Sequence, residues 1–397
     1  MSLLGALNLV RRYSYCVPCQ EGFAPSHKAV GLPDSEYTAP LEEAATMLAA
    51  TVPHALAMRL LARCCGVQLS VKASERMVER RAGALQLLDA QSAHEMAPFD
   101  RKGLPVARQP RPSDAVSEQR TPDTAYLELD GVIPMTREQL TGDELSAKDK
   151  QRQQRAKEQK APGGKARRYR MVGREVKNAV LYDAQDCAKE SEQRGCILRK
   201  TYVSHLGDWE TFAMLLWVEM LRQRFDQARL VVVLSDGAEW IWSLADWLPI
   251  PVLLILDLFH VKHRIWEVAN SLYGEHSPKA RQWAELQAER IEAGHAEKVL
   301  RSLRSLKPSR RETRELLDSL YGYLHDNRDR MNYPDYRARG LRVSSSAVES
   351  ANFHVTGARL KLQGMRWSAA GAAQMALLRA DLFNERWDDR TRQSLAA

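Results

Sequence analysis

The chain has 397 residues, of which 44% are hydrophobic and 27% charged, a composition ordinary for soluble protein of two or three domains. Its six scattered cysteines do not form a disulfide framework, and no apolar run approaches the ~20 residues that span a bilayer. We therefore expect no membrane contact and a cytoplasmic location. The net charge of +8 favours an anionic partner, although a basic surplus alone is weak evidence for nucleic acid.

Residues 1–90 are predicted to form a helical N-terminal domain. Apolar periodicity indicates helices at 41–50, 54–65 and 70–85, and Gly66 separates the last two. Short helices around a glycine-containing turn suggest a DNA-binding helix-turn-helix, whose last helix would present Lys72, Arg76, Arg80 and Arg81 to DNA. The alternative is an amphipathic helix with a solvated charged face, and this segment taken alone favours that alternative.

The N-terminal domain also contains Cys16-Val-Pro-Cys19, which is half of a zinc knuckle. Structural zinc needs four ligands, so a zinc site here requires two further ligands from elsewhere.

Prolines recur between 91 and 122, which predicts a linker. The region 123–257 then reads as an α/β core, because short apolar strands flanking helices are typical of a partly parallel buried sheet. Strands are expected at 124–130, 175–182, 196–203, 230–235 and 251–256, with helices at 208–225 and 238–247 and a basic loop within 143–174. The region 258–340 is predicted to be an all-helical insertion, and 341–397 to supply helices that close the core.

Three acids in this region are candidates for a metal-binding catalytic site. Asp130 ends the first strand, Asp236 follows the fourth, and Glu349 lies in the first turn of a late helix. Strand ends gather at one edge of an α/β sheet, so these carboxylates can converge there. Their oxygens suit Mg²⁺ or Mn²⁺, and two such ions can activate water and stabilise a leaving oxygen at phosphorus.

Each acid also has a purely structural explanation. Asp130-Gly131 and Asp236-Gly237 are common turn dipeptides, and Ser346 to Glu349 matches a helix capping box. The order of the three acids, on the first strand, the fourth strand and then a helix, favours the catalytic interpretation, because it is the arrangement of an RNase H-like core.

Three runs of sequence carry a family resemblance: Leu234-Ser-Asp-Gly-Ala-Glu-Trp-Ile-Trp, Leu256-Asp-Leu-Phe-His-Val-Lys-His-Arg-Ile-Trp, and Val348-Glu-Ser-Ala-Asn with Arg359-Leu-Lys-Leu-Gln-Gly-Met-Arg-Trp-Ser. Over residues 120–385 the chain resembles the insertion-sequence transposases of the Kra family. The resemblance implies an RNase H-like fold in which Asp130, Asp236 and Glu349 cut and join transposon ends. The family pattern Gly-Ser-Gly before the glutamate is replaced here by Ser344-Ser345-Ser346, and the loss of glycine restricts φ and could shift Glu349.

Further residues are assigned supporting roles near this site. Asp257 and His260 are expected to support the metal site, whereas His263 is expected to be structural. Arg359, Lys361 and Arg366 follow the catalytic helix and are expected to hold DNA phosphates, while core packing is the favoured role for Trp367.

These observations predict a DNA transposase that uses Mg²⁺ or Mn²⁺, binds transposon ends and target DNA, and works as a homo-oligomer at the nucleoid. The alternatives are an RNase H-like nuclease without joining activity, a catalytically decayed DNA-binding protein and, more remotely, a zinc hydrolase built on His260 and His263. The sequence leaves open the inverted repeat, the target preference, the mode of transposition and the oligomeric state.

Overall fold

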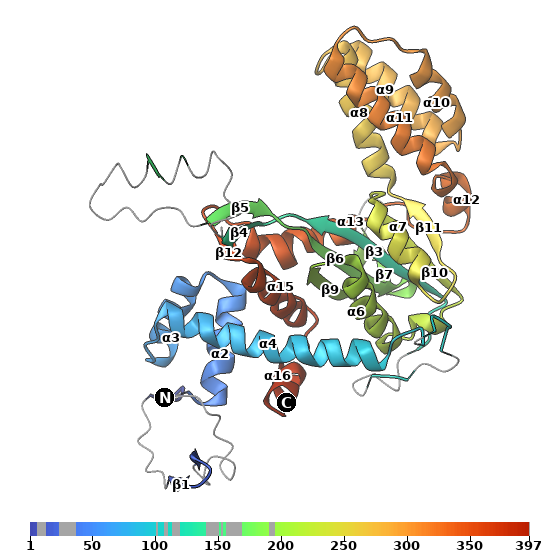
Figure 1. Cartoon of the computed structure of the whole chain (residues 1–397). Helices are drawn as coiled ribbons and strands as arrows, with labels where there is room; N and C mark the ends of the chain where they lie inside the picture. Colours follow the sequence, from blue (N-terminus) through green and yellow to red (C-terminus); the bar gives the residue numbers. More distant parts are fainter. Residues whose placement is uncertain are drawn as a thin grey trace. The chain divides into compact units, whose positions relative to one another are not determined.

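The computed structural model describes residues 1–5, 13–23, 37–100, 102–106, 110–112, 120–139, 151, 154–155, 169–189 and 195–396 (Figure 1). The chain divides into two compact units, each built from segments far apart in the sequence. The first unit comprises Met1–Gln91, Ile133–Val176 and Val355–Ala397, and the second comprises Ser92–Val132 and Lys177–His354. No helix in the described ranges combines the length and the apolar character that crossing a membrane demands.

The first unit joins the N-terminal helices to the C-terminal ones. Helix α3 ends at Gly66, whose positive φ of 69° forms the expected break before the next helix. Helix α15 packs against α2, and a small sheet has the strand order β12-β4-β5. The elements are β1 (Ser14–Cys16), β2 (Glu21–Phe23), α2 (Ala39–Thr51), α3 (His54–Cys65), α4 (Val71–Glu95, which continues just into the second unit), β4 (Met135–Gln139), β5 (Tyr169–Gly173), α14 (Ala358–Leu360), β12 (Trp367–Ser368), α15 (Ala369–Phe383) and α16 (Trp387–Ala396).

This arrangement differs from the predicted domain organisation. The helices of the 341–397 segment were expected to close the α/β core, but α14, α15 and α16 belong to the first unit with the N-terminal helices. Local periodicity identifies such helices and does not tell which distant segment their apolar faces cover. The expected linker also begins later, because α4 continues to Glu95. Most of the expected basic loop lies outside the described residues.

The second unit is built on a mixed five-stranded sheet with the order β11-β10-β3-β6-β9. Strands β3 and β10 pair in parallel, and so do β10 and β11, as the near-continuous apolar strands predicted. Helix α6 contacts both β9 and α7. The elements are β3 (Thr124–Val132), β6 (Val176–Asp183), β7 (Cys187–Lys189), β8 (Gly195–Ile197), β9 (Thr201–Leu206), α6 (Trp209–Arg222), β10 (Leu230–Ser235), α7 (Glu239–Trp247) and β11 (Leu253–Leu256).

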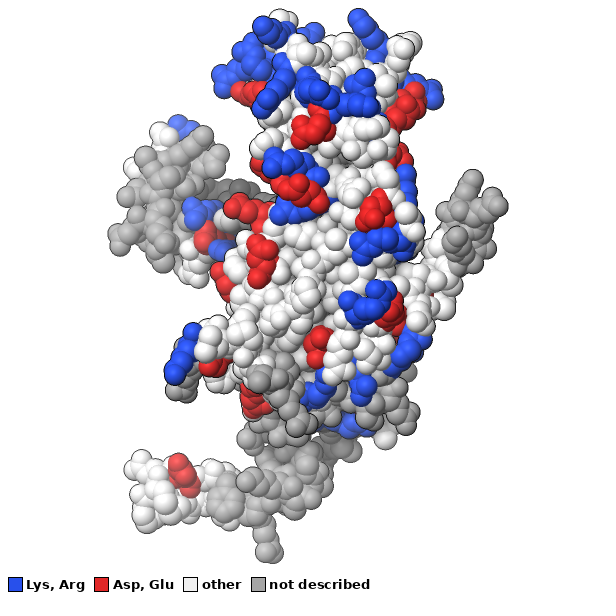
Figure 2. All heavy atoms as spheres, turned by 90° about the vertical axis from the view of Figure 1, so that its right-hand side faces the viewer, with Lys and Arg blue, Asp and Glu red and all other residues white. Residues whose placement is uncertain are grey.

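A helical insertion follows β11, as the sequence predicts. Helix α8 buries Val261, Ile265 and Val268, which recur at the spacing of one helix face, and it contacts α9 and α11 (Figure 1). Lysine and arginine side chains gather over the end of the insertion (Figure 2). The helices are α8 (Leu258–Tyr273), α9 (Pro278–Glu292), α10 (Ala296–Ser305), α11 (Arg311–Asp326) and α12 (Tyr333–Ala338), and the chain then forms α13 (Ser346–Ala351) and a π-helical turn (Asn352–Gly357).

Two buried arginines hold the C-terminal end of α2 in the first unit. Arg359 Nε donates to the carbonyl of Ala49 at 2.9 Å, and Arg379 Nη1 donates to the carbonyl of Ala50 at 2.6 Å. The last carbonyls of a helix have no partner within the helix and carry a partial negative charge, so buried cations stabilise them. Burial and the charge of Arg379 lower the pKa of Arg359 to about 10, which leaves it charged at neutral pH.

We predict that Arg359→Ala lowers the free energy of unfolding by about 2–4 kcal/mol, because it removes a buried hydrogen-bonded cation and leaves helix carbonyls without a partner. Lys361→Ala, two residues away and exposed, is the control and should change stability by less than about 0.5 kcal/mol. Denaturant unfolding of the two variants measures both values. Equal stabilities would show that Arg359 does not support α2.

Candidate active site

The parallel register of the sheet places three acids side by side. Leu129 of β3 is level with Ser235 of β10, and Ser235 is level with Leu256 of β11. The next residue on each strand is therefore one of a row of three: Asp130, Asp236 and Asp257. Neighbouring strands lie ~4.8 Å apart, so this row puts the three aspartates at one edge of the sheet. Sequence reasoning predicted this convergence for Asp130 and Asp236.

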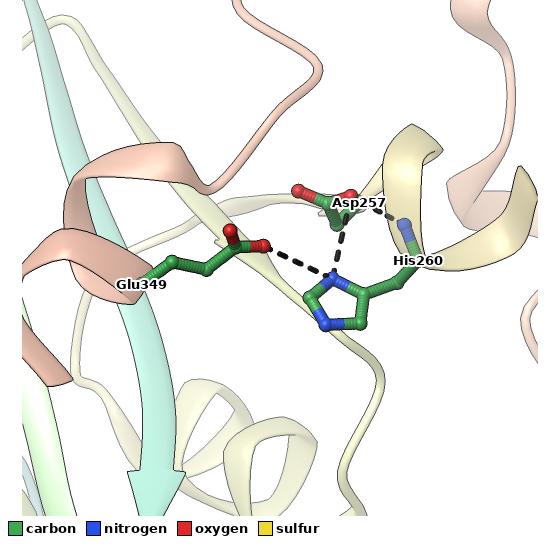
Figure 3. Close-up of side chains that lie close together, drawn as sticks. All are labelled: Asp257, His260 and Glu349. Carbon is green, nitrogen blue, oxygen red and sulfur yellow. Dashed lines mark hydrogen bonds and ion pairs between the residues drawn. The ribbon is translucent and has the colours of Figure 1, made fainter. Parts of the chain in front are cut away.

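Asp257 and His260 form a second polar group beside this row (Figure 3). Asp257 caps α8 by accepting from His260 N at 2.8 Å, and its other oxygen accepts from the backbone N–H and the hydroxyl of Ser345. These hydrogen bonds outweigh the effect of complete burial and lower the pKa of Asp257. Asp257 thereby fixes the turn that precedes α13.

His260 bridges Asp257 and Glu349. Its Nδ1 lies 3.4 Å from Asp257 Oδ1 and 3.7 Å from Glu349 Oε1. The hydrogen-bonding contact with Asp257 raises the pKa of His260, and the negative charges of Asp236 and Glu349 raise it further. His260 thus lies within ion-pairing distance of the Glu349 carboxylate, whose side chain is 52% exposed.

A residue that sequence reasoning missed, Glu128, positions the helix that carries Glu349. Glu128 is fully buried on β3, and its Oε2 accepts from the backbone N–H groups of Ala347 and Val348 at 2.7 and 3.0 Å. Its Oε1 accepts from the Tyr182 hydroxyl at 2.6 Å. A carboxylate at a helix N-terminus satisfies donors that have no partner within the helix. The available signal was an acidic residue inside an apolar strand, two positions before Asp130.

Asn352 links the same helix to the first aspartate. Its Nδ2 donates to Asp130 Oδ2 at 2.5 Å, and its Oδ1 accepts from Asn178 on β6 at 2.6 Å. Ser204 on β9 in turn donates to Asn178 at 2.6 Å. These hydrogen bonds link β9 to Asp130. Asn352 is also the first residue of the π-helical turn, a distortion of the helix that is frequent at functional sites.

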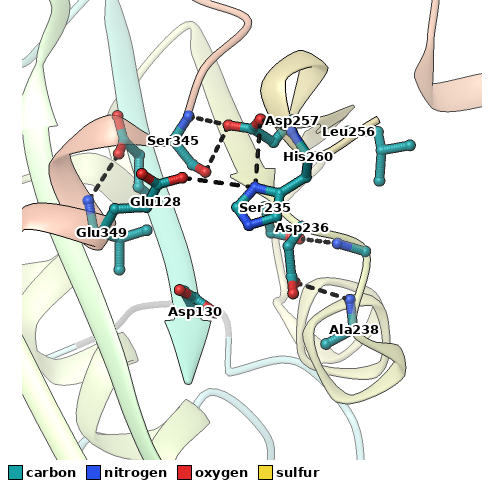
Figure 4. Close-up of polar contacts among 12 residues, drawn as sticks. Glu128, Asp130, Ser235, Asp236, Ala238, Leu256, Asp257, His260, Ser345 and Glu349 are labelled. Carbon is teal, nitrogen blue, oxygen red and sulfur yellow. Dashed lines mark hydrogen bonds and ion pairs between the residues drawn. The ribbon is translucent and has the colours of Figure 1, made fainter. Parts of the chain in front are cut away.

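The carboxylates of Asp130, Asp236 and Glu349 face the same small space (Figure 4). Burial, together with the negative charges of Asp236 and Glu349, raises the pKa of Asp130 from 3.8 to about 6, although the Gly131 N–H and His260 oppose the shift. Like charges close together disfavour ionisation, so part of this shift in the pKa of Asp130 comes from the neighbouring acids. A divalent cation bound among them would relieve the repulsion.

The helical insertion contacts Asp236 directly. Tyr323 on α11 donates its hydroxyl proton to the Asp236 carbonyl at 2.7 Å, and Asp236 Oδ1 accepts from Ala238 N at 3.1 Å. Gly237 has a φ of 96°, and a Cβ there would lie 2.8 Å from Leu256 and 3.0 Å from Tyr323. Glycine is therefore needed at this position both for its backbone conformation and for the close packing.

The carboxylate oxygens of Asp130, Asp236 and Glu349 are the kind of ligand that a hard divalent cation takes. In the described part of the chain, the acids and histidines whose ligand atoms all lie within 4.8 Å of one another form a different set: Asp257, His260 and Glu349. Asp257 is completely buried, however, and its oxygens accept the hydrogen bonds that cap α8 and hold Ser345, so we assign Asp257 a positioning role. His263 is 72% exposed and pairs with Glu267 at 3.5 Å, away from this set.

Comparison with known proteins assigns the chain to a family. The model of an uncharacterised protein family, UPF0236, matches residues 175–392. The chain belongs to UPF0236. The matched region contains Asp236, Asp257, His260 and Glu349, whereas Asp130 lies before it.

No curated protein matches the sequence. Among solved structures, this UPF0236 chain is similar to one described as "Drosophila P element transposase strand transfer complex", with 11% sequence identity, a TM-score of 0.25, and coverage of 92% of this chain and 82% of that chain. A likeness of this extent carries no argument about the fold or the activity.

The turn and capping-box explanations given above for the three acids fare differently in the structure. Gly131 continues β3 and is not part of a turn, whereas Asp236-Gly237 does form one. Glu349 does not close a capping box with Ser346, because the N-cap is Ser345 and Glu128 accepts from the first N–H groups. Ser345 has a φ of −91°, and neither Ser344 nor Ser346 has a positive φ, so serine fits where the Kra-family pattern has glycine.

The predicted DNA-binding residues of the N-terminal domain fall into two groups. Lys72, Arg76 and Arg80 are exposed on α4, and Arg80 pairs with Glu42 at 2.6 Å. Arg81 instead lies 4.2 Å from the Trp387 ring centroid and donates to the Trp387 carbonyl at 3.2 Å. The Arg81 side chain thus makes its contacts within the first unit of this UPF0236 protein.

The basic residues after Glu349 also differ in placement. The prediction that Arg359 holds DNA is wrong for the structure described, because this side chain is completely buried and lies 4.7 Å from the Trp367 ring. Trp367 packs against Arg359 and His54, as the core interpretation expected. Lys361 and Arg366 are exposed, and Arg366 donates to the Tyr169 hydroxyl at 2.7 Å.

Cys16 and Cys19 lie at the turn between β1 and β2, with their Sγ atoms 2.8 Å apart and both side chains exposed. Within the described residues, no further ligand joins them to complete a four-ligand zinc site.

We predict that Asp130→Asn makes the metal-free protein about 1–2 kcal/mol more stable at pH 8 and gives no gain at pH 4. The raised pKa means that Asp130 contributes its stability fully below about pH 4 and loses it as the pH rises through about 6, an effect of up to about 3 kcal/mol. Part of the gain is offset because asparagine cannot accept both present hydrogen bonds. Denaturant unfolding in a chelator measures the change.

Asp318→Asn, at an exposed position on α11, is the control and should shift stability by less than about 0.5 kcal/mol at either pH. An Asp130→Asn protein that is less stable than the wild type at pH 8 would contradict the electrostatic coupling.

Proposed function

We propose that this protein is a DNA transposase that binds transposon ends and catalyses metal-dependent cleavage and strand transfer. The observation that carries the proposal is the convergence of Asp130, Asp236 and Glu349 (Figure 4), in which the charges of Asp236 and Glu349 act on Asp130. The strand order supports it, because the acids lie on the first and fourth strands of the sheet in chain order and on a later helix, as in an RNase H-like core. The Kra-like runs around Asp236, His260 and Glu349 add support from the sequence.

In the proposed reaction, water attacks the phosphorus at the transposon end, and the bond to the 3′ oxygen breaks. The free 3′-OH then attacks a phosphorus in target DNA, forms the new ester and releases a target 3′-OH. Mg²⁺ or Mn²⁺, as a pair of ions, would supply Lewis-acid activation of the nucleophile and stabilisation of the leaving oxygen.

The residues of the chain have distinct tasks in this scheme. Asp130, Asp236 and Glu349 would hold the cations through their carboxylate oxygens. His260 orients Glu349, Glu128 fixes its helix and Tyr323 fixes the backbone of Asp236. The exposed Lys72, Arg76, Arg80, Lys361 and Arg366 are proposed to contact DNA. Two transposon ends must be joined to one target, so we propose that a homo-oligomer performs the reaction.

We predict that Asp236→Ala reduces Mg²⁺-dependent strand transfer at least about a thousandfold, because a metal site supplies several kcal/mol of transition-state stabilisation. The substrate is a labelled duplex carrying the inverted repeats that flank the gene, and joining to plasmid DNA is measured on a gel. Binding of the duplex should persist in the variant.

Asp318→Ala removes an exposed acid from α11 and should leave joining unchanged. Undiminished joining by Asp236→Ala would refute the assignment. Wild-type cleavage without joining would instead identify a nuclease, and end binding without any cleavage would identify a DNA-binding protein that has lost catalysis.

A further inference from the structure

The end of the helical insertion carries a concentration of basic residues that the proposed active site does not use. Between residues 296 and 315 there are seven basic and three acidic side chains. We call the seven the basic tip, and all are exposed: Lys298, Arg301, Arg304, Lys307, Arg310, Arg311 and Arg314. Figure 2 shows lysine and arginine gathered at this end of the insertion.

The fold of α10 and α11 produces this surface. Val299, Leu300 and Leu303 of α10 are buried, while Lys298, Arg301 and Arg304 recur at three-residue spacing on its other side. On α11, Thr313 and Leu317 are buried, and the connection between the two helices adds Lys307 and Arg310. The apolar faces of the two helices are thus covered while the cations remain in solvent.

The cations of the tip are largely not neutralised by the protein itself. In residues 296–315, all of which the structure describes, Arg311 pairs with Glu315 at 2.7 Å and no other tip residue forms an ion pair. Arg304 lies 4.8 Å from the Tyr321 ring centroid, and Arg301 donates only to a carbonyl of its own helix. Uncompensated cations on one surface raise the local concentration of a polyanion and gain free energy when its counterions are released.

A helix of the insertion also runs from the basic tip to the backbone of Asp236 in the candidate active site. Arg311 begins α11, and Tyr323 on the same helix holds the carbonyl of Asp236. Twelve residues of helix span roughly 18 Å, which is the length of about five base pairs of duplex at 3.4 Å each. One duplex can therefore contact the tip while its scissile phosphate lies at the carboxylates.

We propose that the basic tip binds the phosphate backbone of double-stranded DNA without regard to sequence and thereby positions the duplex that enters the active site. This inference rests on the proposed function, because it takes the substrate to be duplex DNA. Exposed cations spread over two helices and their connection suit phosphate contacts, so we assign the tip a positioning role.

The test compares two triple variants of the full chain that lose the same net charge. The tip variant is Arg301→Gln, Lys307→Gln and Arg310→Gln. The control variant is Arg281→Gln, Arg328→Gln and Arg339→Gln, which removes exposed cations of the insertion that are each paired with a nearby acid. Binding to a fluorescent 30-base-pair duplex of random sequence is measured in EDTA by anisotropy over a range of salt concentrations.

The tip variant should lose up to about eightfold in affinity per lost contact at 0.1 M salt, and its plot of log affinity against log salt should become shallower by about 0.9 per contact. The control variant should stay within about twofold of the wild type. Equal affinities and slopes for the two variants would overturn the inference, as would an RNA duplex that competes far better than DNA.

The outcome separates this inference from the proposed function. If the wild type joins DNA but the tip variant binds like the control, the tip is not a DNA surface and the catalytic proposal stands. If the tip variant alone loses DNA binding while the wild type never cleaves or joins DNA, the proposed activity fails and the binding surface stands.

Discussion

The second unit keeps the carboxylates of Asp130, Asp236 and Glu349 near one another, with Asp130 partly buried. Burial and, after it, the negative charges of Asp236 and Glu349 raise the pKa of Asp130, so keeping this carboxylate ionised costs free energy in the absence of a cation. The surrounding contacts offset this cost. Glu128 holds the helix of Glu349, Asn352 donates to Asp130, and Tyr323 holds the backbone at Asp236. A fold that maintains such a cluster with so many dedicated contacts is consistent with a site made for positive charge.

The sheet and the helices contribute differently to this site. Parallel pairing of β3, β10 and β11 sets the aspartates in one row, which no loop movement can undo without breaking the sheet. Glu349 arrives on a short helix and depends on contacts made by Glu128, Asp257 and Ser345 for its position. The helical insertion joins the site through Tyr323, so its orientation and the backbone at Asp236 are coupled.

Much of the second unit could be predicted from the sequence because its signals are local. The apolar runs at 230–235 and 251–256 and the periodicity of 258–273 correspond to β10, β11 (which begins at Leu253) and α8. The buried role of Arg359 could not be predicted, and for Glu128 the apolar strand signals burial but not its partners, because an ionisable residue reveals its partner only when a distant segment covers it. The sequence predicted that α15 packs on the α/β core, but in the structure it packs on α2. An apolar helix face alone does not identify its neighbour.

Calorimetric titration with Mn²⁺ at pH 8 asks whether Asp130, Asp236 and Glu349 together bind divalent cations. We expect the wild type to bind Mn²⁺. Asp130→Asn, Asp236→Asn and Glu349→Gln should each weaken this binding at least about tenfold, whereas His260→Ala should have a smaller effect. Binding that is unchanged in Asp130→Asn but lost in His260→Ala would place the ion at Asp257, His260 and Glu349 and would contradict the account.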